Sequence, residues 1–132
     1  MNYATASDFD RFGIRPEALP ASITTKDKEA AVSAASGRAD SYLGARFRLP
    51  ISAWGDDLRQ AVCAIAAFEL VSTQVGFNPE AGHNLVLVTR KEDAIKWFEQ
   101  VARGHVTPAG IAETPPTTSS VSRVRSNRKR GW

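Results

Sequence analysis

Eight consecutive apolar residues, Ala61 to Phe68, constrain the fold more than any other feature of this sequence. The run is bounded by polar and charged residues and is far shorter than the roughly 20 residues that a membrane-spanning helix needs. One face of the segment is marked by larger side chains at helical spacing, namely Leu58, Val62, Ile65 and Phe68. A helix that is apolar nearly all round belongs in the centre of a bundle, where Cys63 is expected to be a small buried thiol.

Two adjacent acids precede this helix. Either Asp56 or Asp57 is expected to cap it, because carboxylates in the first turn accept amide hydrogen bonds and complement the helix dipole. Neighbouring residues on a helix point in different directions, so capping is favoured over a catalytic pair of carboxylates.

Helical signals recur before the central run. Thr5 and Asp8 have the spacing of a capping box and predict a short helix over 6–12, and Pro16 starts one further turn. A hydroxyl cap at Thr25, followed by apolar residues at three- and four-residue steps, predicts a helix over 26–44.

The last helix is less clearly delimited. Leu85 to Val88 is apolar and β-branched enough for a strand, but Ala94, Trp97-Phe98 and Val101 continue at helical spacing to a stop at Gly104. Helix is therefore favoured over 87–103. Its aromatic pair fits the apolar stripe of this helix better than a platform for stacking nucleic-acid bases.

Residues 44–50 break the helical pattern and predict an ordered extended loop that ends at Pro50. Arg46 and Arg48 flank Phe47 there. Two interpretations stay open: two cations around an exposed aromatic ring that contact phosphate or an acidic neighbour, or two solvated arginines beside a buried phenylalanine.

The charge of the chain is unevenly divided. Of the net charge of +3, the segment from Pro108 onward carries +4, which leaves residues 1–107 at −1. This segment has too few apolar residues to offset the entropy of ordering, so it is expected to be a disordered basic tail that orders only on binding. Its candidate binding residues, for nucleic acid, an acidic groove or an anchoring pocket on a partner, are Arg123, Arg125, Arg128, Lys129, Arg130 and Trp132.

Enzymatic and metal chemistry find little support. The phosphate-binding, dinucleotide-binding and serine-nucleophile motifs are absent, and His83 and His105 lack the spacing of metal ligands. We therefore predict a protein that is not an enzyme, with no cofactor, no metal site and no membrane segment. Residues 1–5 do not resemble a signal peptide, so a cytosolic protein is expected.

Together these patterns predict an all-α protein, a small bundle of about four helices over 1–107 followed by the flexible tail 108–132.

Three groups of residues then suggest a family. In chain order they are Tyr3-Ala4-Thr5 with Arg11-Phe12-Gly13, Tyr42-Leu43 with Arg46-Phe47 and Leu49-Pro50, and Ala94-Ile95-Lys96-Trp97-Phe98 with Ala102-Arg103-Gly104. Their order and spacing over residues 1–107 resemble the Mu-type, gp36-like family of phage head-to-tail connectors. The stretch 78–88 and the long basic tail depart from the usual form of that family.

The resemblance implies a structural adaptor of a tailed phage, present in the virion and assembled in the host cytoplasm. Such an adaptor forms a homo-oligomeric ring, a dodecamer in related systems, between the portal protein and a tail-side stopper or terminator protein, and DNA passes through its lumen. Related adaptors dock into the portal by their C-terminal segments. The alternative is a DNA-binding accessory protein that uses the basic tail.

Overall fold

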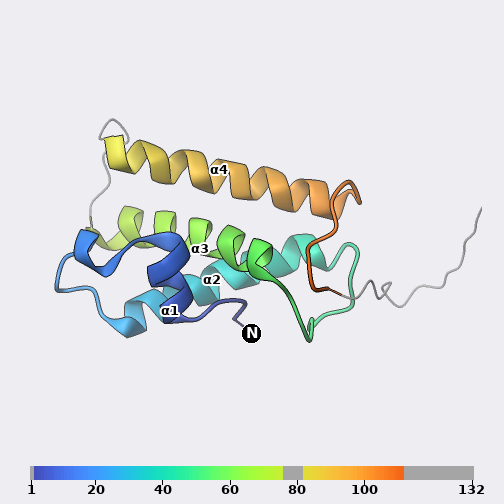
Figure 1. The fold of residues 1–132 in the computed structure, drawn as a ribbon, viewed down its shortest axis with the longest axis horizontal. Helices are drawn as coiled ribbons and strands as arrows, with labels where there is room; N and C mark the ends of the chain where they lie inside the picture. The colour runs from blue at the N-terminus through green and yellow to red at the C-terminus, as the bar shows by residue number, and fades with distance from the viewer. Residues whose placement is uncertain (1, 76–81, 112–132) are drawn as a thin grey trace, which may run out of the picture.

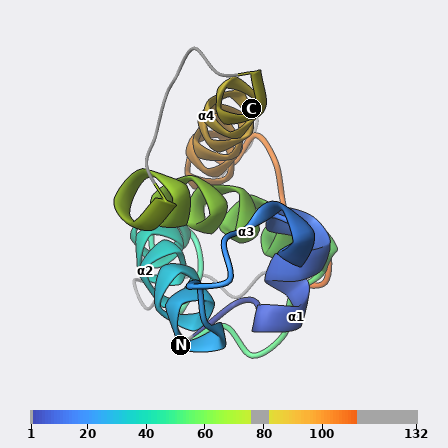
Figure 2. The same cartoon turned by 90° about the vertical axis from the view of Figure 1, so that its left-hand side faces the viewer.

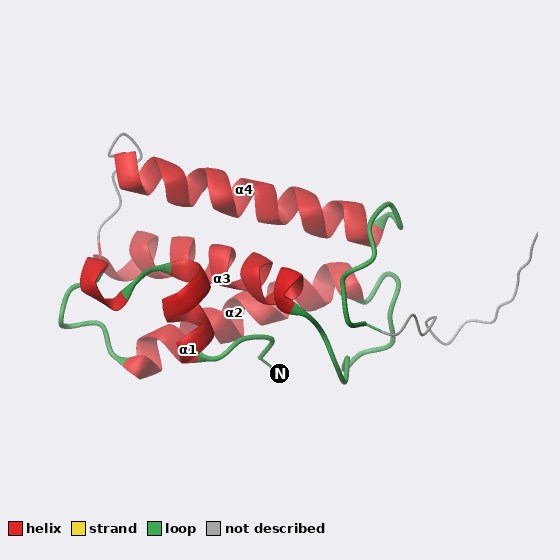
Figure 3. Ribbon diagram, in the orientation of Figure 1, coloured by secondary structure: helices red, strands yellow, loops and turns green. Residues whose placement is uncertain are grey.

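The computed structural model describes residues 2–75 and 82–111, and every regular element within these ranges is helical (Figure 3). The short elements are α1 (Ala6–Asp8), the π-helical η1 (Phe9–Gly13), the 3-10 turn η2 (Pro16–Ala18) and the π-helical η3 (Val71–Val75). The long helices are α2 (Thr25–Leu43), α3 (Asp56–Leu70) and α4 (Gly82–Ala102). The predicted all-α bundle is confirmed.

Helix α3 lies in the centre of the bundle. It packs against α2 on one side and α4 on the other, with η1 beside it (Figures 1 and 2). The three long helices follow one another in alternating directions (Figure 1). Val62, Cys63 and Ile65 are fully buried, which confirms the central position and the buried thiol. Among the helices of the described ranges, none is both long enough and apolar enough to cross a membrane.

Two capping boxes start the first helices. Thr5 and Asp8 form the predicted one. At α2 the cap is Thr24, not the predicted Thr25: the Asp27 amide donates to Thr24 Oγ1 at 3.2 Å, and the Thr24 amide donates to Asp27 Oδ2 at 2.9 Å. A carboxylate three residues later decides between the adjacent threonines, because Thr25 would have a lysine in that position.

The expected cap of α3 is also corrected. Gly55 is the N-cap residue. Its backbone is extended, and it has no side chain that could accept a hydrogen bond from a helix amide. Asp56 and Asp57 are the first two helical residues. Asp56 Oδ1 instead accepts from Arg59 Nη1 at 2.8 Å. Both acids still complement the positive end of the helix dipole from within the first turn.

Helix α4 includes residues 85–88, so the favoured helical interpretation is confirmed and the helix starts five residues before the predicted position 87. Its inward face carries Leu87, Ala94, Phe98 and Val101, all buried. The ring of Phe98 stacks on Tyr42 of α2 with centroids 5.7 Å apart. Trp97 is half-buried and packs against the core, as its place in the apolar stripe predicts.

Candidate interaction site at the base of the tail

The chain turns back on the body as soon as α4 ends. Gly104 has a φ of +84°, and its amide donates to the Val101 carbonyl oxygen at 3.0 Å. The next amide, of His105, donates to the Gln100 carbonyl oxygen at 2.9 Å. This pair of bonds is the Schellman pattern, which favours glycine at the left-handed position. Residues 103–111, here called the return segment, then run along the bundle toward the start of α3 (Figure 1).

Arg46 holds the first half of the return segment. Its Nη1 donates to the carbonyl oxygens of Val101 at 3.1 Å and Val106 at 2.7 Å, and its Nη2 donates to Thr107 Oγ1 at 3.2 Å. The planar guanidinium can serve several acceptors at once, and its positive charge lies at the negative end of the α4 dipole. One side chain therefore joins the end of α2 to the end of α4.

Asp57 holds the second half. Its Oδ2 accepts from the Ala109 amide at 2.8 Å while its Oδ1 accepts from the Leu58 amide at 2.8 Å. Beside this contact the backbones of Gly55 and Gly110 cross so closely that a Cβ on Gly55 would lie 2.9 Å from the Ala109 carbonyl oxygen. The carboxylate and the two glycines fix the return segment against the first turn of α3.

The loop predicted to be extended begins as a tight turn. The Arg46 amide donates to Leu43 at 3.0 Å, and the Phe47 amide donates to the same carbonyl oxygen at 2.8 Å, so the chain tightens before it extends. The interpretation with an exposed aromatic ring is wrong, because the Phe47 side chain is buried in the core. The interpretation with two solvated arginines is wrong for Arg46, which is half-buried and hydrogen-bonded to the return segment. Arg48 is exposed. A contact of Arg46 or Arg48 with a partner stays a prediction.

The predicted binding residues of the tail lie outside the described residues: Arg123, Arg125, Arg128, Lys129, Arg130 and Trp132. The structure does describe residues 108–111, the first four of the predicted tail. Pro108 is buried and Ala109 is hydrogen-bonded to Asp57, so the packed body continues past the predicted boundary at 107.

Other candidate chemistry stays dispersed. Asp56 pairs with Arg59, Asp57 accepts from the amides of Leu58 and Ala109, and His105 is exposed on the return segment. The side chain of His83 lies outside the described part. Within the described ranges, no group of histidine, cysteine and acidic side chains has the arrangement of a metal site.

Sequence reasoning missed Trp54 as a structural residue. Its indole Nε1 donates to the Tyr3 carbonyl oxygen at 2.8 Å, and its ring meets the Tyr3 ring edge-on with centroids 4.9 Å apart. A tryptophan next to a glycine and two acids resembles a surface residue by local pattern. The signal that could have found it is the general tendency of half-buried indoles to find an acceptor.

Comparison with known proteins places this architecture in a family. The family model described as "Bacteriophage Mu, Gp36" matches residues 5–126. The chain belongs to this Mu Gp36 family. It is also 31% identical over 122 residues to "Gene product J" of Escherichia phage Mu, a match that covers 86% of this chain and 81% of the Mu protein.

Membership in the Mu Gp36 family confirms the resemblance and makes this a phage protein. The family match ends at residue 126, whereas the resemblance based on short motifs covered only 1–107. It therefore includes the return segment, with the three residues that Arg46 and Asp57 bind there, and the tail as far as Ser126. The two sections thought to depart from the family pattern, 78–88 and most of the tail, lie within the match.

Proposed function

We propose that this protein is a structural component of the phage particle, a head-to-tail adaptor that forms a ring beneath the portal protein. The support is membership in the Mu Gp36 family, together with the motif resemblance to phage connectors. In this role the protein has no catalytic task. Its partners are the portal, a tail-side stopper or terminator protein, and further copies of itself, and DNA passes through the ring.

The observation that carries the proposal is the fixed position of the return segment. The hydrogen bonds by which Arg46 and Asp57 hold it are here called the clasp. Arg46 and Asp57 fix the chain at positions 106–109, so the basic tail starts from a defined point on the bundle instead of from a frayed helix end. A defined starting point lets every subunit of a ring present its tail in the same direction. Many weak tail contacts then add up, because each tail binds at high effective concentration once its neighbours are anchored.

The experiment compares the full chain with a chain truncated after Ile111, which keeps the clasp intact. Both are mixed with purified portal particles and assayed by co-sedimentation and electron microscopy. We expect the full chain to form a ring on the portal and the truncated chain to stay unbound with an unchanged melting temperature. Portal binding by the truncated chain would overturn the role of the tail.

A third variant separates charge from length. It keeps all residues but replaces Arg123, Arg125, Arg128, Lys129 and Arg130 by glutamine. Weakened portal binding by this variant would assign the contact to the charges, as expected if the portal surface is acidic. A full chain that binds duplex DNA but not portal particles would overturn the adaptor proposal in favour of a DNA-binding accessory protein.

A further inference from the structure

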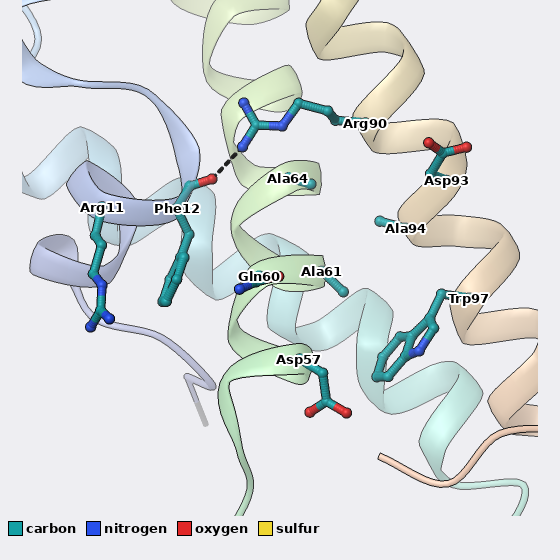
Figure 4. A pocket seen from close by; sticks show the side chains of 10 residues that line it. All are labelled: Arg11, Phe12, Asp57, Gln60, Ala61, Ala64, Arg90, Asp93, Ala94 and Trp97. Carbon is teal, nitrogen blue, oxygen red and sulfur yellow. Dashed lines mark hydrogen bonds between the residues drawn. The ribbon is translucent and has the colours of Figure 1, made fainter. Parts of the chain in front are cut away.

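A groove with a volume of about 430 Å³ lies between η1, α3 and α4 (Figure 4). Its floor is lined by residues without bulk, Ala61 and Ala64 of α3 and Ala94 of α4. Figure 4 shows the Trp97 side chain on the α4 side and Asp57 at one end of the groove. Because alanine side chains are short and the neighbouring side chains are larger, the groove has room for an additional segment of chain.

Of the two arginines that line this groove, Arg90 of α4 is bound to η1, and Arg11 is a residue of η1 itself. Arg90 of α4 donates to the Phe12 carbonyl oxygen (Figure 4) and to that of Gly13 at 3.4 Å. The Arg11 guanidinium lies 4.8 Å from the centroid of the Phe12 ring. Arg90 thus ties η1 to α4, whereas the exposed Arg11 contacts the ring of its own neighbour within η1.

The opposite part of the groove offers acids and an aromatic ring. Asp93 and Trp97 line it one turn apart on the same face of α4, and Asp57 lies at the end of the groove away from Arg90 (Figure 4). The Asp93 carboxylate is on an exposed position, next to Arg90. A carboxylate can bind a guanidinium group by two parallel hydrogen bonds, in a bidentate pair. The face of an indole ring attracts a guanidinium group as well, by a cation–π interaction. This combination suits an arginine side chain of a basic peptide.

The tail of the chain begins beside this part of the groove. Asp57, which lines it, accepts the hydrogen bond from the Ala109 amide, two residues before the described structure ends at Ile111. Arg123 lies twelve positions after Ile111, and an extended chain of that length reaches up to about 40 Å. The section of α4 from Arg90 to Trp97 is about 10 Å long at the helical rise, so the tail can easily reach any point of the groove.

We propose that this groove binds the arginine-rich part of the same chain's own tail, residues 123–130. An arginine lies over the Trp97 ring and pairs with Asp93 or Asp57, while the alanine floor accommodates the adjacent backbone. Attachment to the same chain gives the tail an effective concentration on the order of millimolar, so even a weak contact is populated. In the free subunit, the tail then docks on its own body, at a site separate from any site on a partner. This inference concerns the isolated subunit and does not depend on the adaptor role.

The test uses the full chain labelled with ¹⁵N and carrying a spin label at Ser126→Cys. Cys63 is fully buried, so the label attaches at the new site. We expect the Trp97 indole signal and the amide signals of Ala61 and Ala64 to lose most of their intensity when the label is active. Amides on the outer face of α2, such as that of Gly37, should keep theirs.

A matched pair of charge reversals provides the control. Asp93→Arg places a cation in the groove, whereas Glu92→Arg changes the neighbouring exposed acid of α4, which does not line it. Reversal at Asp93 should lower the equilibrium constant for tail docking about fivefold to tenfold, and reversal at Glu92 by less than about twofold. Equal effects of the two variants would overturn the proposal.

Two further results decide the occupant. No loss of signal in the groove with the label at position 126 would overturn the proposal. Loss of signal in a mixture of ¹⁵N-labelled chains without the spin label and unlabelled chains with it would also overturn it, because the tail would then come from a second copy. A docked tail that is released when salt rises from about 0.05 to 0.5 M would support it, since exposed charge pairs are screened.

Discussion

The hydroxyl of Tyr3 donates a hydrogen bond to the carboxylate of Asp40, near the end of α2. The backbone of Tyr3 is held as well: its amide donates to Ser36 Oγ at 3.0 Å, and its carbonyl oxygen accepts from the Trp54 indole at 2.8 Å. Tyr3 itself is almost fully buried. One residue thus pins the start of the chain to α2 and to the segment that leads into α3.

Removal of this hydroxyl by Tyr3→Phe should lower the free energy of unfolding by about 1–2 kcal/mol, because a partly buried carboxylate loses its donor. Tyr42→Phe is the matched control, since the Tyr42 ring keeps its stacking on Phe98. That variant should stay within about 0.5 kcal/mol of the parent. Urea denaturation of the three proteins measures the difference, and equal losses would contradict the role assigned to the Tyr3–Asp40 bond.

Alkaline pH should destabilise the fold through two buried groups. Burial, together with the hydrogen bond to Asp40 and its charge, raises the pKa of Tyr3 well above its ordinary value of 10.0. Burial, with a smaller effect of Asp8, raises the pKa of Cys63 from 9.0 to about 12. The unfolded chain then releases protons that the folded chain retains, so stability is intact below about pH 9 and falls as the pH rises above it.

Each group should contribute a slope of up to about 1.4 kcal/mol per pH unit once the pH exceeds its ordinary pKa. Urea titrations between about pH 8 and pH 11 should therefore show a shallower loss for Cys63→Ala and for Tyr3→Phe, and the shallowest for the double variant. The same pH dependence in all four proteins would show that neither group is responsible.

The spacing of apolar residues was sufficient to predict the helices, because it is repeated along each helix. Leu87, Ala94, Phe98 and Val101 all face the core, and their joint spacing outweighs the strand-like composition of residues 85–88. Helix starts depend on single residues and are less secure. Thr24 and Thr25 differ as caps only through the residue that follows three positions later.

The base of the tail could not be predicted in the same way. Arg46 finds its acceptors 55 to 61 positions later in the chain, and Asp57 meets Ala109 after 52 positions. Nothing in the residues around Arg46 distinguishes it from Arg48, which is exposed. Which of two similar arginines becomes structural depends on where α4 ends relative to the loop, and that is a property of the packed bundle.

The clasp itself can be tested with these two arginines. Arg46→Lys should lower the free energy of unfolding by about 1–2 kcal/mol, because one ammonium group cannot serve the acceptors of Val101, Val106 and Thr107 in the geometry of the planar fork. Arg48→Lys should change it by less than about 0.5 kcal/mol. Hydrogen exchange should show faster opening of residues 103–109 in the first variant alone. Equal protection of this segment in both would contradict the clasp.

Two glycine substitutions should have opposite signs. Gly110 has a φ of +78°, and a Cβ there would lie 3.0 Å from the Gly55 nitrogen, so Gly110→Ala should destabilise by about 1–3 kcal/mol. Gly37 lies within α2 with nothing within 4 Å of an added Cβ, so Gly37→Ala should stabilise by about 0.5–1 kcal/mol. Denaturant midpoints measure both. A neutral Gly110→Ala variant would mean that the backbone crossing at Gly55 is not rigid.

The five basic residues of the tail distinguish a portal contact from a DNA contact. If all five neutralise phosphates of a duplex, the logarithm of the affinity should fall with the logarithm of salt with a slope of about −4.5. We expect such binding at low salt and its loss on truncation after Ile111, because residues 1–107 carry a net charge of −1. At about 0.15 M salt, we expect portal binding to persist while duplex binding becomes weak, since complementary protein surfaces add packing to charge. Fluorescence anisotropy with labelled duplex and co-sedimentation with portal particles measure the two affinities. A duplex affinity that equals or exceeds the portal affinity at this salt concentration would contradict the adaptor and favour the DNA-binding alternative.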